Sequence, residues 1–156
     1  MTTLVFRSWL IMELSNSSSP LTKTETSLLK SHLGEGEALI ENLVTALKTN
    51  SWIMNQELAS VLKPILMRLC ARYLVQEKRR NFALNSVANF HLRNGSCLWR
   101  INWMADSSRR GMVNSCGMMV NYRYFLDRLE TNSTAYLNHY TIDADPQVTN
   151  LLTDDE

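Results

Sequence analysis

The spacing of apolar residues changes between residues 80 and 87, and this change constrains the fold more than any other feature of the sequence. Before it, apolar side chains recur every three or four positions, as on one face of a helix. From Val87 to Met104 they alternate with polar side chains, as on strands that bury one face. The sequence therefore predicts an α+β protein with a helical first half, followed by a β-hairpin, a helix and a further strand.

Start and stop signals divide the first half into four expected helices. The pair Thr22 and Glu25 has capping-box spacing, so a first helix is expected to begin there and to end near Gly34. A second helix is expected from about residue 35 to 48, and Asn55 can cap a short third one. Pro64 is expected at the first turn of the fourth helix, where its missing N–H costs nothing.

The dipeptide Asn94-Gly95 is the strongest short hairpin signal in the chain. With these two residues as the loop, His91 pairs with Leu98 and Asn89 pairs with Arg100. One face of the predicted hairpin is then entirely apolar, and it comprises Ala88, Phe90, Leu92, Cys97, Trp99, Ile101 and Trp103. The opposite face is polar, and it comprises Asn89, His91, Arg93, Arg100 and Asn102.

Beyond the hairpin the sequence predicts one more helix and one more strand. Ser107 or Ser108 can cap a helix that ends at Cys116-Gly117, and residues 118–125 have the pattern of a strand. After this strand the chain becomes polar and acidic.

The charges are distributed unevenly along the chain. The formal net charge is only +1, but residues 63–128 hold twelve basic and three acidic side chains, a net +9. The flanks are acidic, with net charges of −2 over residues 1–62 and −6 over residues 129–156. A basic segment favours a polyanionic partner, either nucleic acid or a phosphate-rich cofactor such as coenzyme A. Part of this charge, including Lys78–Arg80 at the expected end of the fourth helix, equally suits an ordinary solvated surface.

Several classes of protein are disfavoured by the remaining composition. The three cysteines form no metal-type pair and are an odd number, so neither a disulfide framework nor a local metal site is expected. The three histidines are scattered as well. No apolar run approaches the roughly 20 residues that a bilayer-spanning helix needs, so no membrane span is expected. The sequence also lacks the known motifs of nucleic-acid-binding modules.

His91 is the most informative single residue. Imidazole, guanidinium and carboxamide groups on one strand face suit an anionic ligand whose carbonyl or carboxylate needs fixed donors. The alternatives are a hydrogen-bonded structural histidine, and a solvated or interface face.

Four segments closely resemble motifs of the C-terminal part of malonyl-CoA decarboxylases. They are Pro64-Ile-Leu-Met-Arg-Leu-Cys-Ala-Arg-Tyr-Leu, Val87-Ala-Asn-Phe-His-Leu-Arg-Asn-Gly, Leu98-Trp-Arg-Ile-Asn-Trp-Met-Ala-Asp and Ser115-Cys-Gly-Met-Met-Val-Asn-Tyr-Arg-Tyr-Phe. The resemblance extends more loosely from about Phe6 to about Tyr136. We therefore expect residues 21–136 to form the C-terminal part of the catalytic domain, between a poorly defined segment (1–20) and an acidic, loosely held tail (137–156).

The resemblance implies an N-acetyltransferase-like (GNAT) fold and the conversion of malonyl-CoA to acetyl-CoA and carbon dioxide in fatty-acid metabolism. It places the catalytic histidine of the family at His91, which would donate a proton to the enolate. Asn89 and Arg100 are added as substrate-binding candidates because they share the predicted face with His91. No metal or organic cofactor is expected, because the thioester itself accepts the electrons released with carbon dioxide.

The resemblance also implies homo-oligomers, and a mitochondrial, peroxisomal or cytosolic location. The chain ends in Asp-Asp-Glu, which is not the C-terminal peroxisomal signal. The catalytic serine of the family lies in a Ser- and Pro-rich loop that Met1 to Val5 do not reproduce, so the chain is expected to be truncated and inactive alone. The alternatives are a non-enzymatic fragment that associates with full-length subunits, and a basic nucleic-acid-binding module.

Overall fold

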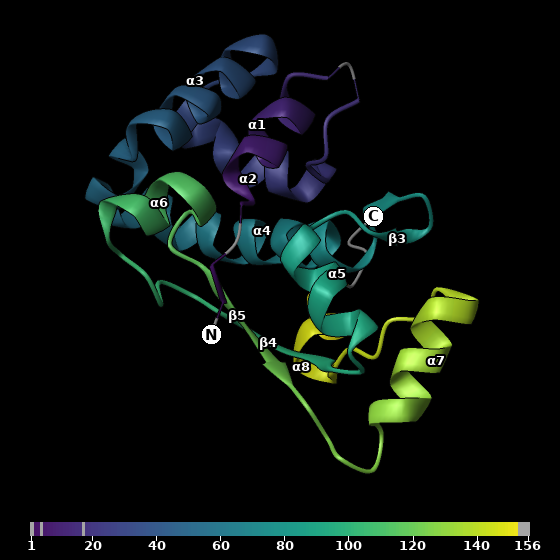
Figure 1. Ribbon diagram of the computed structural model, residues 1–156. Coiled ribbons are helices and arrows are strands. Elements are labelled where there is room, and N and C mark those ends of the chain that lie inside the picture. The colour runs from purple at the N-terminus through teal and green to yellow at the C-terminus, as the bar shows by residue number, and fades with distance from the viewer. Residues whose placement is uncertain (1, 4, 17, 153–156) are drawn as a thin grey trace.

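The computed structural model describes residues 2–3, 5–16 and 18–152, which form an α+β fold with eight α-helices and two small sheets in this part of the chain (Figure 1). In chain order the elements are β1 (Thr2–Thr3), α1 (Arg7–Leu14), α2 (Lys23–Leu33), α3 (Gly36–Thr49), the 3₁₀ turn η1 (Ser51–Met54), α4 (Gln56–Val75), β2 (Lys78–Arg79), β3 (Phe82–Ala83), α5 (Ser86–Arg93), β4 (Cys97–Asn102), α6 (Arg109–Ser115), β5 (Met119–Arg123), α7 (Leu129–His139), α8 (Pro146–Thr149) and the 3₁₀ turn η2 (Asn150–Leu152). The predicted α+β class is confirmed.

Helices α1, α2 and α3 group at one end of the molecule, and α7 lies at the opposite end (Figure 1). The long helix α4 runs beneath them and contributes the largest share of buried side chains. None of the described helices is both long and apolar enough to cross a membrane.

The predicted capping box is present at the start of α2. The Thr22 hydroxyl accepts a hydrogen bond from the Glu25 backbone N–H at 3.1 Å, and the Glu25 carboxylate accepts one from the Thr22 N–H at 2.9 Å. The same carboxylate pairs with the Arg68 guanidinium of α4 at 2.6 and 2.7 Å. The local start signal of α2 therefore also fixes this helix to α4.

Pro64 lies inside α4, so the expectation that it begins a fourth helix is wrong. Asn55 caps this helix, as predicted, through its side-chain oxygen and the Leu58 N–H, but the helix then continues without a break to Val75. Pro64 is exposed, and the helix buries nine side chains on its other face. This burial outweighs the cost of roughly 3 kcal/mol that proline imposes in a helix interior.

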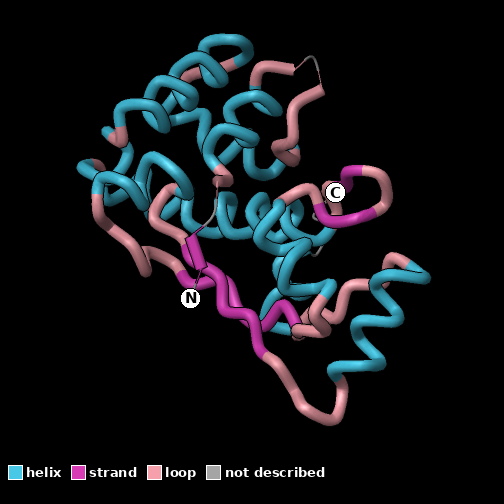
Figure 2. The backbone as a smooth tube through the Cα atoms, viewed as in Figure 1, coloured by secondary structure: helices cyan, strands magenta, loops and turns pink. Residues whose placement is uncertain are grey.

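The main sheet has three antiparallel strands in the order β1-β5-β4, drawn as the long strand group in Figure 2. In β4 and β5, Leu98 pairs with Tyr122, Ile101 with Val120, and a bulge separates the Leu98 pair from the Arg100 pair. Both strands lie within the segments predicted for them, and Ser108 caps α6 as expected.

The predicted hairpin around Asn94-Gly95 is wrong, because residues 86–93 form helix α5 with Asn85 as its cap. The Gly95 N–H donates to the Leu92 carbonyl at 3.0 Å, and the Ser96 N–H donates to the His91 carbonyl at 3.1 Å. These two bonds, with Gly95 at φ +88°, form a Schellman motif that ends a helix. The dipeptide is a helix stop rather than a hairpin turn.

A hairpin does occur fourteen residues earlier, between β2 and β3. Arg80 and Asn81 both have positive φ angles, 52° and 74°, which is the geometry of the tightest hairpin loops. Lys78–Arg80 therefore belong to this hairpin and not to the end of a helix, as had been expected, because α4 already ends at Val75.

The segment expected to be poorly defined (1–20) and the tail expected to be loosely held (137–156) both contain packed residues. Phe6, Trp9 and Leu10 are buried in the core, and Trp9 stacks near Tyr73 of α4. In the C-terminal flank, Val148 is fully buried and the chain at Ala144 forms a parallel bridge with Leu98 of β4. Residues 153–156 lie outside the described part of the chain.

Candidate active site

His91 lies near the C-terminal end of α5 and faces two tyrosines that β5 and its extension provide. Its imidazole is stacked on the Tyr122 ring, with a centroid distance of 4.3 Å and an interplanar angle of 17°. Its Nδ1 atom lies 2.6 Å from the Tyr124 hydroxyl, a short hydrogen bond. Because Tyr122 and Tyr124 are two positions apart in an extended segment, both side chains project to the same side and meet one imidazole.

The environment shifts the pKa values of all three groups. Burial lowers the pKa of His91 below the ordinary value for histidine, because a partly desolvated imidazole resists protonation. Burial likewise raises the pKa values of Tyr122 and Tyr124, so both phenols keep their protons at neutral pH. The group is therefore a neutral imidazole held between two neutral phenols.

The two ring nitrogens of His91 differ in their contacts. No described residue forms a hydrogen bond with Nε2 of His91, since Tyr124 occupies Nδ1. Phe90 approaches the imidazole edge-on, with a centroid distance of 5.2 Å, and is 61% exposed rather than buried as the predicted hairpin required. The exposed, apolar Phe90 side chain thus adjoins an imidazole whose Nε2 can donate a hydrogen bond or exchange a proton.

Asn89 and Arg100 do not join His91, because the predicted polar hairpin face does not form. Asn89 lies on another face of α5, where its side-chain oxygen accepts a hydrogen bond from the Tyr136 hydroxyl at 2.7 Å. Arg100 pairs with Asn121, the neighbour of Tyr122, and therefore faces the opposite side of the sheet from Tyr122 and its stacked imidazole. The reasoning that selected these two residues does not hold.

Tyr122 and Tyr124 were missed as partners of His91 by reasoning from the sequence. Their spacing of two in a predicted strand placed them on one side, but nothing in the sequence indicated that α5 would lie against that side.

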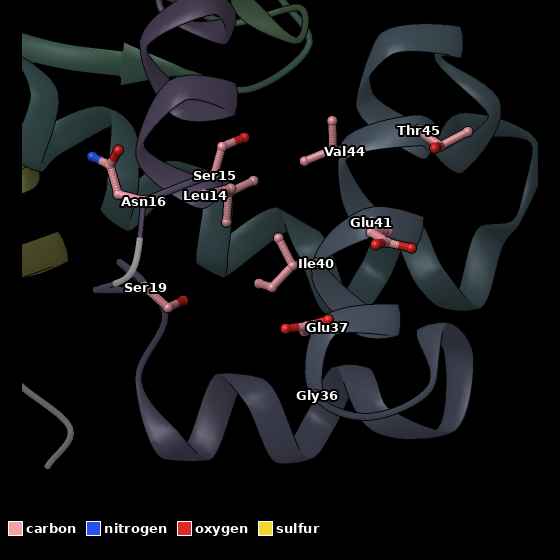
Figure 3. A pocket seen from close by; sticks show the side chains of 10 residues that line it. All are labelled: Leu14, Ser15, Asn16, Ser19, Gly36, Glu37, Ile40, Glu41, Val44 and Thr45. Carbon is pink, nitrogen blue, oxygen red and sulfur yellow. The ribbon is translucent and has the colours of Figure 1, made fainter.

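A separate cavity lies in the groove between α1, α3 and the loop that follows α1 (Figure 3). It has a volume of about 780 Å³ and an apolar floor of Leu14, Ile40 and Val44, with Glu37 and Glu41 at its edge. It shares no residue with the His91 site. Within the described chain, no three His, Cys, Asp or Glu side chains lie close enough together to hold a metal ion.

Comparisons with known proteins agree on one family. The sequence matches the family described as the malonyl-CoA decarboxylase C-terminal domain over residues 3–156. It is 50% identical over 117 residues to the mitochondrial malonyl-CoA decarboxylase of Rattus norvegicus, a match that covers 75% of this chain and 24% of the relative. The mitochondrial malonyl-CoA decarboxylase of Anser anser anser is 47% identical over 147 residues, covering 92% of this chain and 29% of the relative.

The fold matches solved structures that carry the same name. The malonyl-CoA decarboxylase of Rhodopseudomonas palustris superposes with a TM-score of 0.77 at 34% identity, over 96% of this chain and 31% of the other. That of Agrobacterium vitis gives a TM-score of 0.78 at 29% identity, over 97% of this chain and 34% of the other. The chain thus spans less than a third of the curated relatives, but nearly all of it is matched. It belongs to the malonyl-CoA decarboxylase family.

Proposed function

We propose that this chain supplies the proton donor, His91, to a malonyl-CoA decarboxylase that converts malonyl-CoA to acetyl-CoA and carbon dioxide. The observation that carries the proposal is the fixed imidazole, which is bonded through Nδ1 to Tyr124 and has no described partner at Nε2. A histidine held in this way can serve as a proton donor, because Tyr124 fixes one ring nitrogen and the other has no described partner. Family membership supports the same reaction.

The reaction needs such a group at one defined step. Loss of carbon dioxide from a malonyl thioester leaves an enolate, whose carbon must then receive a proton. The thioester carbonyl accepts the electron pair of the broken carbon–carbon bond, so the chemistry requires no metal or organic cofactor. A histidine whose pKa lies near or below neutrality takes up a proton from water before the step, delivers it from Nε2 of the imidazolium to the enolate carbon, and returns to the neutral imidazole.

Residues outside this chain would complete the active site. The chain spans 24% and 29% of the two curated relatives, and the Ser- and Pro-rich loop expected from the resemblance is not among its motifs. We propose that it forms the C-terminal part of an N-acetyltransferase-like domain, that the full enzyme is a homo-oligomer, and that the chain alone is inactive. The names of both relatives favour mitochondria over peroxisomes or cytosol.

Nucleic-acid binding is not favoured by the geometry of the basic segment. The Arg123 guanidinium lies 4.6 Å from the centre of the Trp99 ring, and the Arg128 guanidinium lies 4.0 Å from that of Phe125. Trp103 packs near the buried Trp52. These aromatic rings and arginines contact one another, whereas a stacking platform for bases presents open rings.

A hybrid enzyme tests the proposal. The matching segment of the rat relative is replaced by this chain, and release of carbon dioxide from labelled malonyl-CoA is measured. We expect H91A to lower turnover by about 100-fold or more, the usual contribution of a general acid. H139A, in an exposed histidine of α7, is the matched control and should leave turnover within about twofold of the parent hybrid. Near-normal turnover of H91A would return His91 to a structural role.

A further inference from the structure

We propose that Tyr122 is a positioning residue for His91. The Tyr122 ring stacks flat on the imidazole and sets its plane, so that Nδ1 stays bonded to Tyr124 and Nε2 remains available. This inference rests on the proposed role of His91 and adds to it a residue that touches neither substrate nor product. Tyr122 stacks on one face of the imidazole, and Tyr124 lies at its edge.

The stack is close and nearly parallel. A centroid distance of 4.3 Å with an angle of 17° is at the short end of aromatic contacts, where rings usually pack offset or edge-on at larger separations. By contrast, Tyr124 meets the same imidazole at 6.0 Å and 59°, so its ring touches the edge while its hydroxyl holds Nδ1. The two tyrosines thus constrain different degrees of freedom, namely the ring plane and the hydrogen-bond direction.

Tyr122 is suited to this task because it is held from two sides. Its backbone pairs with Leu98, which is fully buried, in the β4–β5 ladder beside the bulge. Its phenol oxygen is buried and has no hydrogen-bond partner among the described residues. Cys70 and Tyr73 of α4 lie near this phenol, and together with burial they raise its pKa. A ring held by a strand pair and a core helix gives the imidazole a fixed surface.

The arrangement also selects one tautomer. Among the described residues, the titratable groups that face the imidazole are the phenols of Tyr122 and Tyr124, with Cys70 and Tyr73 behind Tyr122. Each of these is neutral at pH 7, because burial disfavours its anion. We assign the Tyr124 hydroxyl as the donor to Nδ1, which leaves the hydrogen of the neutral imidazole on Nε2. Without the stack, the imidazole can rotate about its bond to Cβ and leave Tyr124.

The buried phenol oxygen is an unusual cost for a core tyrosine. A phenylalanine would give the same ring without an unpaired hydroxyl. We therefore assign the positioning role to the Tyr122 ring and not to its oxygen. This distinction separates a positioning role from a hydrogen-bonding one and can be tested with two variants.

The test uses nuclear magnetic resonance of the full 156-residue chain labelled with nitrogen-15. The imidazole signals of His91 are identified by their loss in H91Q. In the parent chain we expect a single neutral tautomer with hydrogen on Nε2 near pH 7.5. Y122F should keep these shifts. Y122L should move them toward the averaged values of a free imidazole. It should also raise the pH at which His91 is half protonated, which corresponds to an increase of about threefold or more in proton affinity. Y140L, in an exposed tyrosine of another element, is the control that leaves them unchanged.

Three results would overturn the proposal: unchanged His91 signals in Y122L, equal disturbance in Y122F and Y122L, or averaged signals in the parent chain. In the hybrid enzyme, Y122L is further expected to lower kcat about tenfold with KM within about twofold, while Y122F retains the parent values. If H91A leaves the hybrid active, the proposed function fails, but the resonance data still decide whether Tyr122 positions the imidazole.

Discussion

Replacing Gly95 with alanine should destabilise the chain far more than an ordinary glycine substitution. Gly95 has φ +88° in the Schellman motif that ends α5, and a Cβ atom placed there would collide with the backbone carbonyl of Leu129. That carbonyl belongs to the first turn of α7. The Asn132 side chain donates to the Gly95 carbonyl at 3.2 Å, so the same contact joins α7 to α5.

The size of the effect follows from three contributions. The left-handed conformation costs an alanine roughly 1–2 kcal/mol. Reduced freedom of the unfolded chain offsets this by about 0.4–1 kcal/mol. The collision with a backbone atom adds overpacking of about 1–3 kcal/mol, because a backbone cannot rotate away as a side chain can. We therefore expect G95A to lower the free energy of unfolding by about 3 kcal/mol.

Gly36 provides a matched control. It also has a positive φ, 59°, but no described atom lies within 4 Å of the position its Cβ would take. G36A therefore carries only the backbone contributions and should cost about 1 kcal/mol or less. Urea unfolding followed by circular dichroism measures both variants. If G95A and G36A differ by less than about 0.5 kcal/mol, the close approach of α7 to Gly95 does not exist in solution.

Three further predictions use the same unfolding assay. E25A should cost about 2–3 kcal/mol, because it removes half of the capping box and leaves the mostly buried Arg68 with only the Pro20 carbonyl as a partner. E35A, in an ion pair with Lys30 that is 59–69% exposed, should cost less than about 0.5 kcal/mol, and equal effects would contradict this. Y122F should stabilise the chain by about 1 kcal/mol by removing an unpaired buried hydroxyl, and destabilisation would indicate that the hydroxyl has a partner. Burial lowers the folded pKa of His91, so the contribution of His91 to stability is present above its unfolded pKa of about 6.5 and is lost as pH falls toward the folded pKa. H91Q should flatten this dependence of the unfolding free energy on pH, and an unchanged dependence would contradict the prediction.

The features that could be predicted from the sequence are those decided by neighbouring residues. The capping box of Thr22 and Glu25, the caps at Asn55 and Ser108, and the strands around Ile101 and Val120 all depend on contacts within a few positions or on a simple alternation. Each is present in the structure.

Asn94-Gly95 shows where this local reasoning fails. Both a type I′ hairpin and a Schellman stop need residues that tolerate left-handed backbone, so the dipeptide fits either. The pattern of residues 86–93 also fits both periods, because its few apolar side chains lie at alternate positions and at helical spacing. Tertiary contacts decide between them: as a helix, α5 buries Ala88 and Leu92 in the core and turns Phe90 outward.

The same ambiguity explains why His91 was selected together with the wrong companions. The predicted strand face and the resemblance to a family motif both identified His91, whereas its neighbours came from the strand register alone. In a helix, side chains two positions apart point to nearly opposite sides, so Asn89 leaves the site and binds Tyr136. The true partners come from β5, more than thirty residues later, and only the packing of α5 against the sheet brings them to the imidazole.

Stability and chemistry are therefore linked at the end of α5. The His91 carbonyl accepts the Ser96 N–H of the Schellman motif, while the His91 imidazole binds Tyr124 and stacks on Tyr122. The backbone of the candidate proton donor is thus fixed by the turn at Gly95, and its side chain is fixed by β5. We expect a change at Gly95 that moves this turn to shift the imidazole relative to Tyr124. Because hydrogen-bond strength falls steeply with poor alignment, a small displacement of α5 is enough to release Nδ1. The glycine that ends the helix consequently belongs to the support of the site as much as to the fold.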